Sequence, residues 1–259
     1  MIRLTRTTPE PDALRVAREA ELPKARAAAA AGWKGSDGRP FKFARYDAGK
    51  QTLFTDQHQK CAYCEKREEQ AQHRDVEHYR PKVEYWWLAW TWENLLFACF
   101  ACNRDYKKRQ FPLSNGAHRL VAEAPPPGQE QPLLLDPFDP TSDPRRHIEF
   151  RRERRSGKER WIPYGLSPAG DETIRVCGLS RPSLLDLYTD HVNNFVRPRV
   201  LVFENAVEKG DVRGIRDGWS TMCRALLGPR SEFCGLSRDA LAVLVPAATR
   251  EQFQLVFPE

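Results

Sequence analysis

The sequence contains no long apolar run, because no window of it approaches eighteen uninterrupted apolar residues. Its first residues, MIRLTRTTPEP, carry charge but lack the apolar stretch of a secretory signal. We therefore expect a cytoplasmic protein with no membrane partner. A G-x-x-x-x-G-K-[ST] phosphate loop is also missing, so nothing predicts a nucleotide-binding sensor within this chain. We find no internal repeat, and 259 residues suffice for one large core or two small ones.

Acidic residues are fewer than basic ones, with 35 Asp and Glu against 41 Lys and Arg, so the formal charge is +6. This balance, with a pI near 9.0, favours polyanionic partners over acidic small molecules. Seven cysteines are an odd number, and their spacing indicates a reducing compartment. Cys177, Cys223 and Cys234 show no paired spacing, so we expect them to be buried as small apolar side chains.

The other four cysteines form two C-x-x-C pairs, Cys61 with Cys64 and Cys99 with Cys102. Each pair can direct two thiolates at one ion, and two pairs complete the closed sulfur site of structural zinc. The intervening loop, residues 65–98, is long for such a site. Loop closure costs only about 0.6 kcal/mol per doubling of length, whereas structural zinc contributes on the order of 10 kcal/mol. The sequence therefore predicts a zinc site whose long loop is available for other chemistry.

That loop and Asn103, the residue after the second cysteine pair, carry the candidate catalytic groups. The segment DVEHY at 75–79 is predicted to be a short strand, with His78 near its end and directed into a cleft. The apolar run NLLFACF at 94–100 suits the second strand of a hairpin. A helix is expected after Cys102, with Asn103 near its start and Pro112 limiting its length. The predicted order is strand, long loop, strand and helix around one metal site.

Five aromatic residues crowd the loop, and two interpretations of them are open. They are Tyr85, Trp86, Trp87, Trp90 and Trp92. Such residues can provide a platform on which nucleic-acid bases stack. A small zinc module also needs large apolar side chains to build a core. We predict that most of the set belongs to the core.

The string E-H-x-x-P, followed by N-L-L and by C-x-x-C-N with a lysine soon after, resembles the signature of HNH endonucleases. That resemblance implies a ββα-metal fold. The longer stretches CAYCE, EHYRPK and ACNRDYKKRQFPL resemble, more narrowly, the HNH subunit of Septu-type and retron-associated anti-phage systems, the PtuB-like proteins. The motif covers about a fifth of the chain, and the resemblance is weaker beyond Pro112.

The resemblance implies a role for each motif residue. His78 would be the general base, and Glu77 and Asn103 would hold a catalytic divalent ion, Mg²⁺ or Mn²⁺. Asn94 would hold the long loop and orient His78. Many HNH enzymes have Asp where Glu77 stands, although a longer carboxylate can still bind the ion. The basic residues expected to contact nucleic acid, with DNA favoured over RNA, are Arg80, Lys82, Lys107 and Lys108.

The same residues fit the chemistry without the resemblance. Hydrolysis of a phosphodiester needs a base that activates water and an ion that neutralises charge on the phosphate and the departing oxygen. A histidine beside a carboxylate, with an asparagine opposite, supplies the base and hard oxygen ligands. His58 and His73 lie near the module in sequence and remain alternative bases.

Outside the module the pattern is less specific. Residues 1–6 are compatible with a short strand, and a helix is expected from Asp12, with a kink or break at Pro23. Residues 147–164 suggest a basic hairpin that turns at Ser156-Gly157, which could contact nucleic acid, contact a partner or remain solvated. A helix interrupted near Pro198 is expected after Ser180. Another is expected after Ser237, with a break at Pro246.

The predicted fold class is α+β, with four segments: a helical lead (1–57), an HNH nuclease module (58–115), a Pro-rich connector (116–132) and a region of hairpin and helices (133–259). The predicted function is metal-dependent cleavage of nucleic acid as the effector of an anti-phage system. The resemblance also implies a PtuA-like ATPase partner. Consistent with a separate ATPase, this chain has no phosphate loop of its own. An RNA-cleaving effector and a non-catalytic, zinc-stabilised nucleic-acid-binding module remain alternatives.

Overall fold

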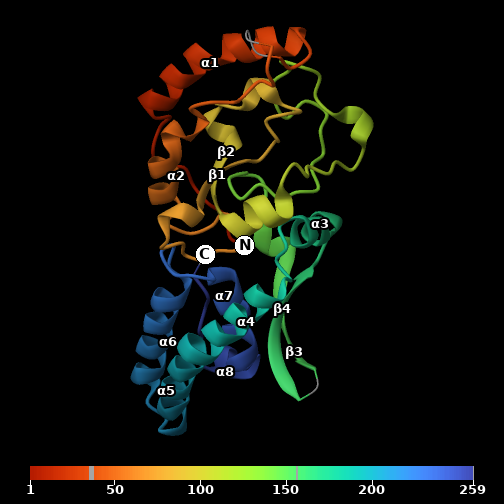
Figure 1. Cartoon of the computed structure of the whole chain (residues 1–259). Helices are drawn as coiled ribbons and strands as arrows, with labels where there is room; N and C mark the ends of the chain where they lie inside the picture. Colours follow the sequence, from red (N-terminus) through yellow and green to blue (C-terminus); the bar gives the residue numbers. More distant parts are fainter. Residues whose placement is uncertain (35–37, 156, 259) are drawn as a thin grey trace.

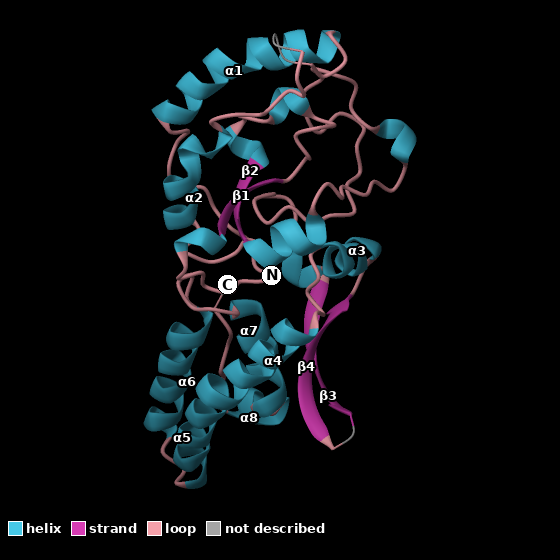
Figure 2. Cartoon of the chain, viewed as in Figure 1, coloured by secondary structure: helices cyan, strands magenta, loops and turns pink. Residues whose placement is uncertain are grey.

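Two antiparallel hairpins and a set of α-helices organise the chain (Figure 1). The structure is a computed structural model, and it describes residues 1–34, 38–155 and 157–258. Helix α2 packs against the hairpin of β1 and β2, and α1 lies farther out in the same part of the molecule (Figure 1). Helices α4 and α7 pack against the hairpin of β3 and β4, with α5 and α6 on the far side of them (Figure 1). Helix and loop dominate, and both sheets are small (Figure 2). The expected α+β class is therefore confirmed.

The first hairpin pairs β1 (Arg74–His78) with β2 (Leu95–Cys99). Arg74 lies opposite Cys99, and His78 lies opposite Leu95, so the sulfur ligand and the histidine are at opposite ends of the hairpin. All five residues of β2 are buried. A strand that is buried on both faces needs a continuous apolar run, which the sequence LLFAC supplies. Both predicted strands are confirmed.

The segment after β2 is a π-helical turn, Ala101–Lys107, rather than a regular helix that begins at Asn103. Its wider turn places Cys102 and Asn103 directly after the strand. π-Helical turns are rare and occur frequently at functional sites. The predicted helix is thus present, but it begins earlier and is wound more loosely than expected.

The crowded aromatic residues of the long loop form part of the core. All five have exposed fractions of 9% or less, and Trp90 is fully buried. The Trp90 indole donates a hydrogen bond to the carbonyl of Ala44, and Trp86 and Trp87 meet edge to face. Indole N–H groups need such partners when they are buried. The prediction of a core role is confirmed, and none of the five rings is available as an exposed stacking platform.

At the N-terminus, α1 (Asp12–Ala30) continues through Pro23, so the expected kink or break does not end the helix. Pro23 lies on the exposed face of α1, where water can satisfy the backbone group that proline leaves unpaired. The expected strand at residues 1–6 is wrong. This segment is irregular, and Leu4 donates one backbone hydrogen bond to Pro137. The short helix α2 (Lys50–Asp56) was not predicted.

The second hairpin consists of β3 (Ile148–Arg155) and β4 (Lys158–Gly165), as predicted. Gly157 has a φ of +77°, a backbone conformation that favours glycine. The other residue of the predicted turn, Ser156, lies outside the described residues. Arginines on the hairpin are offset by carboxylates, as where Arg151 pairs with Glu149.

Six helices follow or flank this hairpin in the C-terminal region. Their bounds are α3 Pro168–Val176, α4 Pro182–His191, α5 Arg197–Glu208, α6 Val212–Leu227, α7 Cys234–Leu244 and α8 Ala247–Gln252. A π-helical turn, Val192–Val196, joins α4 to α5 just before Pro198, so the predicted interruption is confirmed. Pro246 separates α7 from α8 as expected, although α7 begins before Ser237. Helices α3 and α6 were not predicted.

One cluster of buried apolar side chains runs through both parts of the fold, from Met1 to Leu255. Cys177, Cys223 and Cys234 belong to it or lie beside it with exposed fractions of 5% or less, which confirms their predicted burial. The four segment boundaries stay a prediction, because the shared core does not mark them. Within the described ranges, no helix has the length and apolar character needed to cross a membrane.

Candidate active site and metal centre

The two C-x-x-C pairs come together as predicted. The sulfur atoms of Cys61, Cys64, Cys99 and Cys102 all lie within 4.8 Å of one another, and all four residues are buried. The Sγ atoms of Cys64 and Cys99 are 3.8 Å apart. Zinc–sulfur bonds of about 2.3 Å in a tetrahedron require sulfur atoms about 3.8 Å apart. The thiolate set therefore fits zinc in number, chemistry and spacing.

Local backbone geometry explains how the first pair reaches the site. The amide of Glu65 donates to the carbonyl of Cys61, and the amide of Cys61 donates to the carbonyl of Lys66, which closes a tight turn. Glu65 has a φ of +61°, so the turn depends on a left-handed residue. The end of β2 supplies Cys99, and the π-helical turn supplies Cys102.

A buried arginine from the C-terminal region completes the surroundings of the sulfur cluster. Arg181 donates to Sγ of Cys102 at 3.4 Å and to the carbonyl of Gly178 at 2.9 Å. Burial lowers the pKa of Arg181, but the negative charges of Cys102 and Cys64 raise it by more. Four thiolates around one Zn²⁺ leave an excess of negative charge, and this guanidinium offsets part of it.

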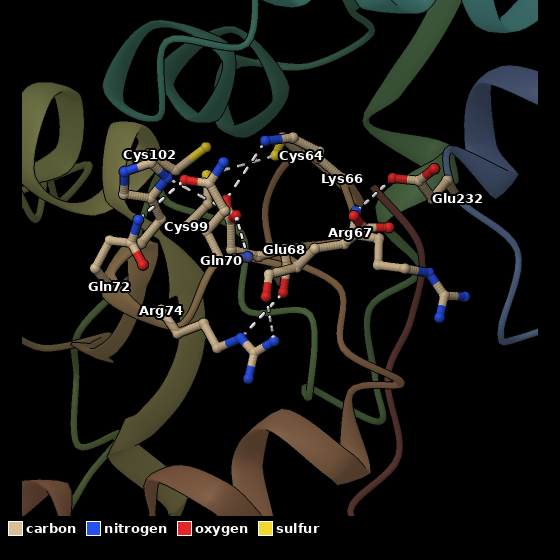
Figure 3. A network of polar contacts seen from close by, with 12 residues as sticks. Cys64, Lys66, Arg67, Glu68, Gln70, Gln72, Arg74, Cys99, Cys102 and Glu232 are labelled. Atoms are coloured by element: carbon tan, nitrogen blue, oxygen red, sulfur yellow. Dashed lines mark hydrogen bonds and ion pairs between the residues drawn. The ribbon is translucent and has the colours of Figure 1, made fainter.

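The segment after the first pair links the cluster to both the hairpin and the C-terminal helices (Figure 3). The Arg74 guanidinium donates to the carbonyl of Glu68 at 3.0 Å, and the amide of Arg67 donates to Glu232 at 2.6 Å. Glu232 lies just before α7, far from this segment in sequence. The zinc-binding turn is thus held from two sides.

A cleft of about 630 Å³ opens along β1, and it contains the predicted catalytic residues Glu77, His78 and Asn103. Of the six histidines of the chain, all of which the structure describes, only His78 lines it. His58 and His73 lie outside this lining, so the geometry does not support either as the base.

The imidazole of His78 is 6% exposed and firmly held. Its Nε2 lies 2.9 Å from the carbonyl of Ala89, and the ring meets Tyr46 at a centroid distance of 4.8 Å. Because a carbonyl only accepts hydrogen bonds, Nε2 carries the proton and Nδ1 is left as the proton acceptor. Burial and the charge of Lys82 lower the pKa of His78 to about 3, so the ring is neutral near pH 7. A neutral imidazole is the form that acts as a base.

Asn94 fastens the loop that follows His78. Its side-chain oxygen accepts from the amide of Arg80 at 2.8 Å, and its side-chain nitrogen donates to the carbonyls of Arg80 and Leu88 at 3.0 and 3.1 Å. Asn94 does not touch the imidazole. It holds the loop whose Ala89 carbonyl does, so any orienting effect on His78 is indirect.

Glu77 and Asn103 line the same cleft, and a second carboxylate, Asp75, lines it with them. Strand residues alternate between faces, so Asp75 and Glu77 project from the same face of β1. The Asn103 amide nitrogen donates to Asp75 at 3.2 Å, which leaves its carbonyl oxygen available to a cation. Asp75 was not among the residues predicted from the sequence, although its position two residues before Glu77 on the same strand was the signal. The donor set is hard oxygen, which suits Mg²⁺ or Mn²⁺.

Glu77 also has a buried cationic partner. Lys107 is fully buried, forms an ion pair with Glu77, and donates to the backbone carbonyl of His78 at 2.9 Å. Burial raises the pKa of Glu77, and the charge of Lys107 opposes that rise. The expectation that Lys107 contacts nucleic acid is therefore wrong, because its ammonium group lies inside the protein and holds two site residues.

The other predicted nucleic-acid contacts divide into two groups. Arg80 is also misassigned, because it is 9% exposed and its guanidinium pairs with Glu130 at 2.8 Å. Lys82 and Lys108 line the cleft, and their contact with nucleic acid stays a prediction. Further basic residues that line it were not identified from sequence, and they are Lys50, Arg74, Arg104 and Arg109. Arg104 forms an ion pair with Asp75, whereas the group as a whole makes the cleft basic.

Residues 61–109 match the family model described as HNH endonuclease. This stretch is an HNH domain. Its bounds run from the first zinc-type cysteine to a basic residue of the cleft, so the HNH domain contains both the sulfur cluster and the four predicted catalytic residues, Glu77, His78, Asn94 and Asn103.

The chain is also similar to Septu protein PtuB of Bacillus mycoides (strain KBAB4), with 32% identity over 164 residues. The match covers 57% of this chain and 52% of that protein, so it spans about half the length of this curated relative. No solved structure matches the chain. The likeness to PtuB thus extends well beyond the HNH domain but leaves much of both chains unmatched.

Proposed function

We propose that this protein is a metal-dependent HNH endonuclease that hydrolyses phosphodiester bonds of nucleic acid, with DNA favoured over RNA. The observation that carries the proposal is the neutral, buried His78, which lies in a basic cleft with Glu77 and Asn103. A binding module has no need of a held base beside hard oxygen ligands. The four cysteines are proposed to hold structural zinc.

In the proposed reaction, His78 takes a proton from water through Nδ1 while its Nε2 stays bonded to Ala89. Glu77 and Asn103 would hold the catalytic ion, and Asp75 fixes the Asn103 amide. A divalent ion bound there supplies positive charge for the phosphate and the departing 3′ oxygen. Lys82 and Lys108 attract the phosphate backbone from the wall of the cleft.

The decisive assay incubates the purified chain with plasmid DNA, single-stranded DNA and tRNA, with Mg²⁺, with Mn²⁺ and with neither. We expect ion-dependent cleavage of DNA by the wild type and by His73→Ala, and cleavage by His78→Ala that is slower by orders of magnitude. Cleavage of tRNA alone would favour the RNA-cleaving effector. Binding without any cleavage, by wild type as by His78→Ala, would favour the non-catalytic module.

We further propose that the protein acts in the cytoplasm as the effector of a Septu-type defence system with a PtuA-like ATPase. Similarity to a protein named Septu protein PtuB supports the defence role. The chain has no phosphate loop, which supports a separate ATPase. Four exposed apolar residues on α4, the following π-helical turn and α5 support docking by this region, and they are Leu187, Phe195, Leu201 and Val202.

Co-purification with the ATPase of the same system tests the partner. Deleting residues 180–259 would unfold the chain, since Arg181 contacts the sulfur cluster and α4 is part of the shared core. The sharper variant is the double substitution Leu201→Glu and Val202→Glu, at residues that are 60% and 72% exposed. We expect it to abolish the complex. Val121→Glu, at a residue that is 75% exposed outside this surface, is the control. An undiminished complex would exclude the α5 surface as the dock.

A further inference from the structure

A second cavity, with a volume of about 1020 Å³, lies in the C-terminal part of the fold and is larger than the cleft around His78. The two cavities share no lining residue. Helices α6 and α7 line this one together with residues 2–3 and 256–258. Figure 1 shows why, since the two ends of the chain lie close together beside these helices. Nothing in the proposed nuclease chemistry uses this space.

The wall of the cavity is largely apolar. Trp219 and Phe257 pack together with ring centroids 5.1 Å apart, and Cys223 and Leu227 extend the same surface. The Trp219 indole N–H is already bonded to the carbonyl of Val256 at 2.8 Å. This wall can therefore receive a flat apolar group, while it offers little hydrogen bonding of its own.

Three arginines face the cavity with only neutral hydrogen-bond partners. Arg3 donates to a backbone carbonyl at 3.3 Å, and Arg238 donates to another at 2.7 Å. Arg224 donates to two hydroxyl groups on its own helix at 3.0 and 3.2 Å. Carbonyls and hydroxyls satisfy N–H groups but do not neutralise a guanidinium charge. In the described part of the chain, none of these three arginines is ion-paired with a carboxylate.

The remaining charges of the cavity do not restore neutrality. Arg145 pairs with Asp143 at 2.8 Å, so the one carboxylate among the described lining residues already has a partner. Counted over those described residues, four arginines against one aspartate leave an excess of +3. Burial lowers the pKa of Arg238, and the positive charge of Arg145 lowers it further, while the charges of Asp239 and Asp143 offset part of this effect. Arg238 and Arg145 thus contribute like charges to one cavity lined largely by apolar side chains.

Some arginines elsewhere in the fold have carboxylate partners, as Arg80 pairs with Glu130 and Arg104 with Asp75. Others, such as Arg74, also donate to backbone carbonyls, but they do not gather around one cavity with an apolar wall. Guanidinium groups match phosphate and carboxylate oxygens in a two-pronged geometry. A group of them without carboxylate partners, in a cavity of this size, calls for an anion from outside the chain.

We propose that this cavity binds a nucleotide, with its phosphate chain on Arg3, Arg224 and Arg238 and its base against the apolar wall. Adjacent phosphates supply several negative charges within a short distance, whereas an acidic side chain of a peptide supplies one. A lone inorganic phosphate would leave most of the volume and the Trp219 wall unused. The site differs from a phosphate loop because side chains, rather than backbone amides, provide the recognition.

Isothermal titration of the full-length protein with ATP, without added divalent ions, tests the proposal. We expect ATP to bind, and we expect Arg224→Ala to weaken binding about tenfold, the loss of roughly one charged hydrogen bond. Arg224 is exposed, so this substitution leaves the fold intact. Arg3→Ala provides a second exposed variant. The matched control is Arg213→Ala, also on α6, whose side chain is 93% exposed outside the cavity.

Three further titrations decide the ligand class and the location. Tripolyphosphate and adenosine should each bind more weakly than ATP if both the arginines and the apolar wall take part. Lys82→Ala, in the nuclease cleft, should leave ATP binding unchanged. The proposal is overturned if tripolyphosphate binds as tightly as ATP, if ATP does not bind, or if Lys82→Ala rather than Arg224→Ala weakens its binding.

Discussion

At one end of the β1–β2 hairpin, Cys99 joins three other thiolates in a closed, buried sulfur site, while at the other end His78 and Glu77 face a cleft. The sulfur site is built from two C-x-x-C pairs. One pair lies in the tight turn after Cys61, and the other joins the end of β2 to the π-helical turn. The cleft is built from a strand end, a long loop and a π-helical turn. One hairpin therefore separates a site that stabilises the fold from a site that can expose its ligands to a substrate.

The two sites also manage charge differently. Around the thiolates, the guanidinium of Arg181 adds positive charge to that of the expected zinc. In the cleft, the buried Lys107 binds Glu77 and the backbone of His78, so the protein itself supplies a cation beside the proposed ion ligands. A structural site gains from being closed, whereas a catalytic site must keep coordination positions open. The predictions below test this division of roles.

The largest expected effect is at the sulfur site. Cys61→Ser should remove the zinc and yield misfolded protein, because structural zinc contributes on the order of 10 kcal/mol to folding. Elemental analysis should find about one zinc per wild-type chain, as four thiolates around one ion require. Cys223→Ser, at a cysteine that is buried outside the cluster, should keep its zinc. A folded, zinc-free protein with nuclease activity would contradict the assignment.

The next effect is confined to the rate of cleavage. His78→Ala should lower the rate by about 10²- to 10⁴-fold, the usual contribution of a general base. Zinc content and the unfolding midpoint should stay near those of the wild type, which separates the two ends of the hairpin. His73→Ala is the control, since His73 does not line the cleft. Wild-type rates in the His78→Ala protein would remove His78 as the base.

The third prediction concerns Lys107, the buried cation beside the cleft, and its contribution to the stability of the protein. Lys107→Met removes a buried partner and leaves Glu77 uncompensated, which should lower the free energy of unfolding by about 3–5 kcal/mol. Urea denaturation measures this loss. Adding Glu77→Gln to Lys107→Met should recover part of it, because the unpaired charge is then gone.

The control for Lys107 is its neighbour. Lys108→Met changes an exposed residue, so the free energy of unfolding should move by no more than about 0.5 kcal/mol. If both substitutions lowered the free energy of unfolding equally, the buried ion pair of Lys107 and Glu77 would not stabilise the protein more than an exposed lysine does.

The smallest expected effect concerns nucleic-acid affinity. Lys82→Ala should weaken binding modestly and uniformly across sequences, and it should reduce the slope of log affinity against log salt by about 1. Binding titrations at several salt concentrations measure that slope. Arg80→Lys, at a buried residue paired with Glu130, should leave it unchanged. A salt slope that responds to Arg80 and not to Lys82 would reverse the assignment.

Local spacing explains why some predictions from the sequence were confirmed. Each C-x-x-C pair fixes two thiolates within one turn, and the apolar run LLFAC determines a buried strand. Pro198 follows the π-helical turn between α4 and α5, and Pro246 separates α7 from α8. Both interrupt the regular helix, because proline has no amide hydrogen to donate. Pro23 did not break α1, because it lies on the exposed face of the helix, where water can bond the backbone carbonyl that proline leaves unpaired.

Basic residues show where local reasoning fails. Lys107 and Lys108 are adjacent and chemically identical, yet one is fully buried and the other is exposed in the cleft. Arg80 and Lys82 differ in the same way, because Glu130, fifty positions along the chain from Arg80, pairs with the arginine. Sequence identifies a positive charge, but only the fold identifies its partner.

The sequence by itself determined the sulfur ligands and the two strands of the first hairpin, because the spacing of two C-x-x-C pairs and a short apolar run act over a few residues. Only the tertiary structure decided that Lys107 holds Glu77, that Arg181 reaches Cys102, and that arginines from both ends of the chain share one cavity. These outcomes depend on contacts between distant segments. Burial and charge pairing are set by such contacts, and no local pattern specifies them.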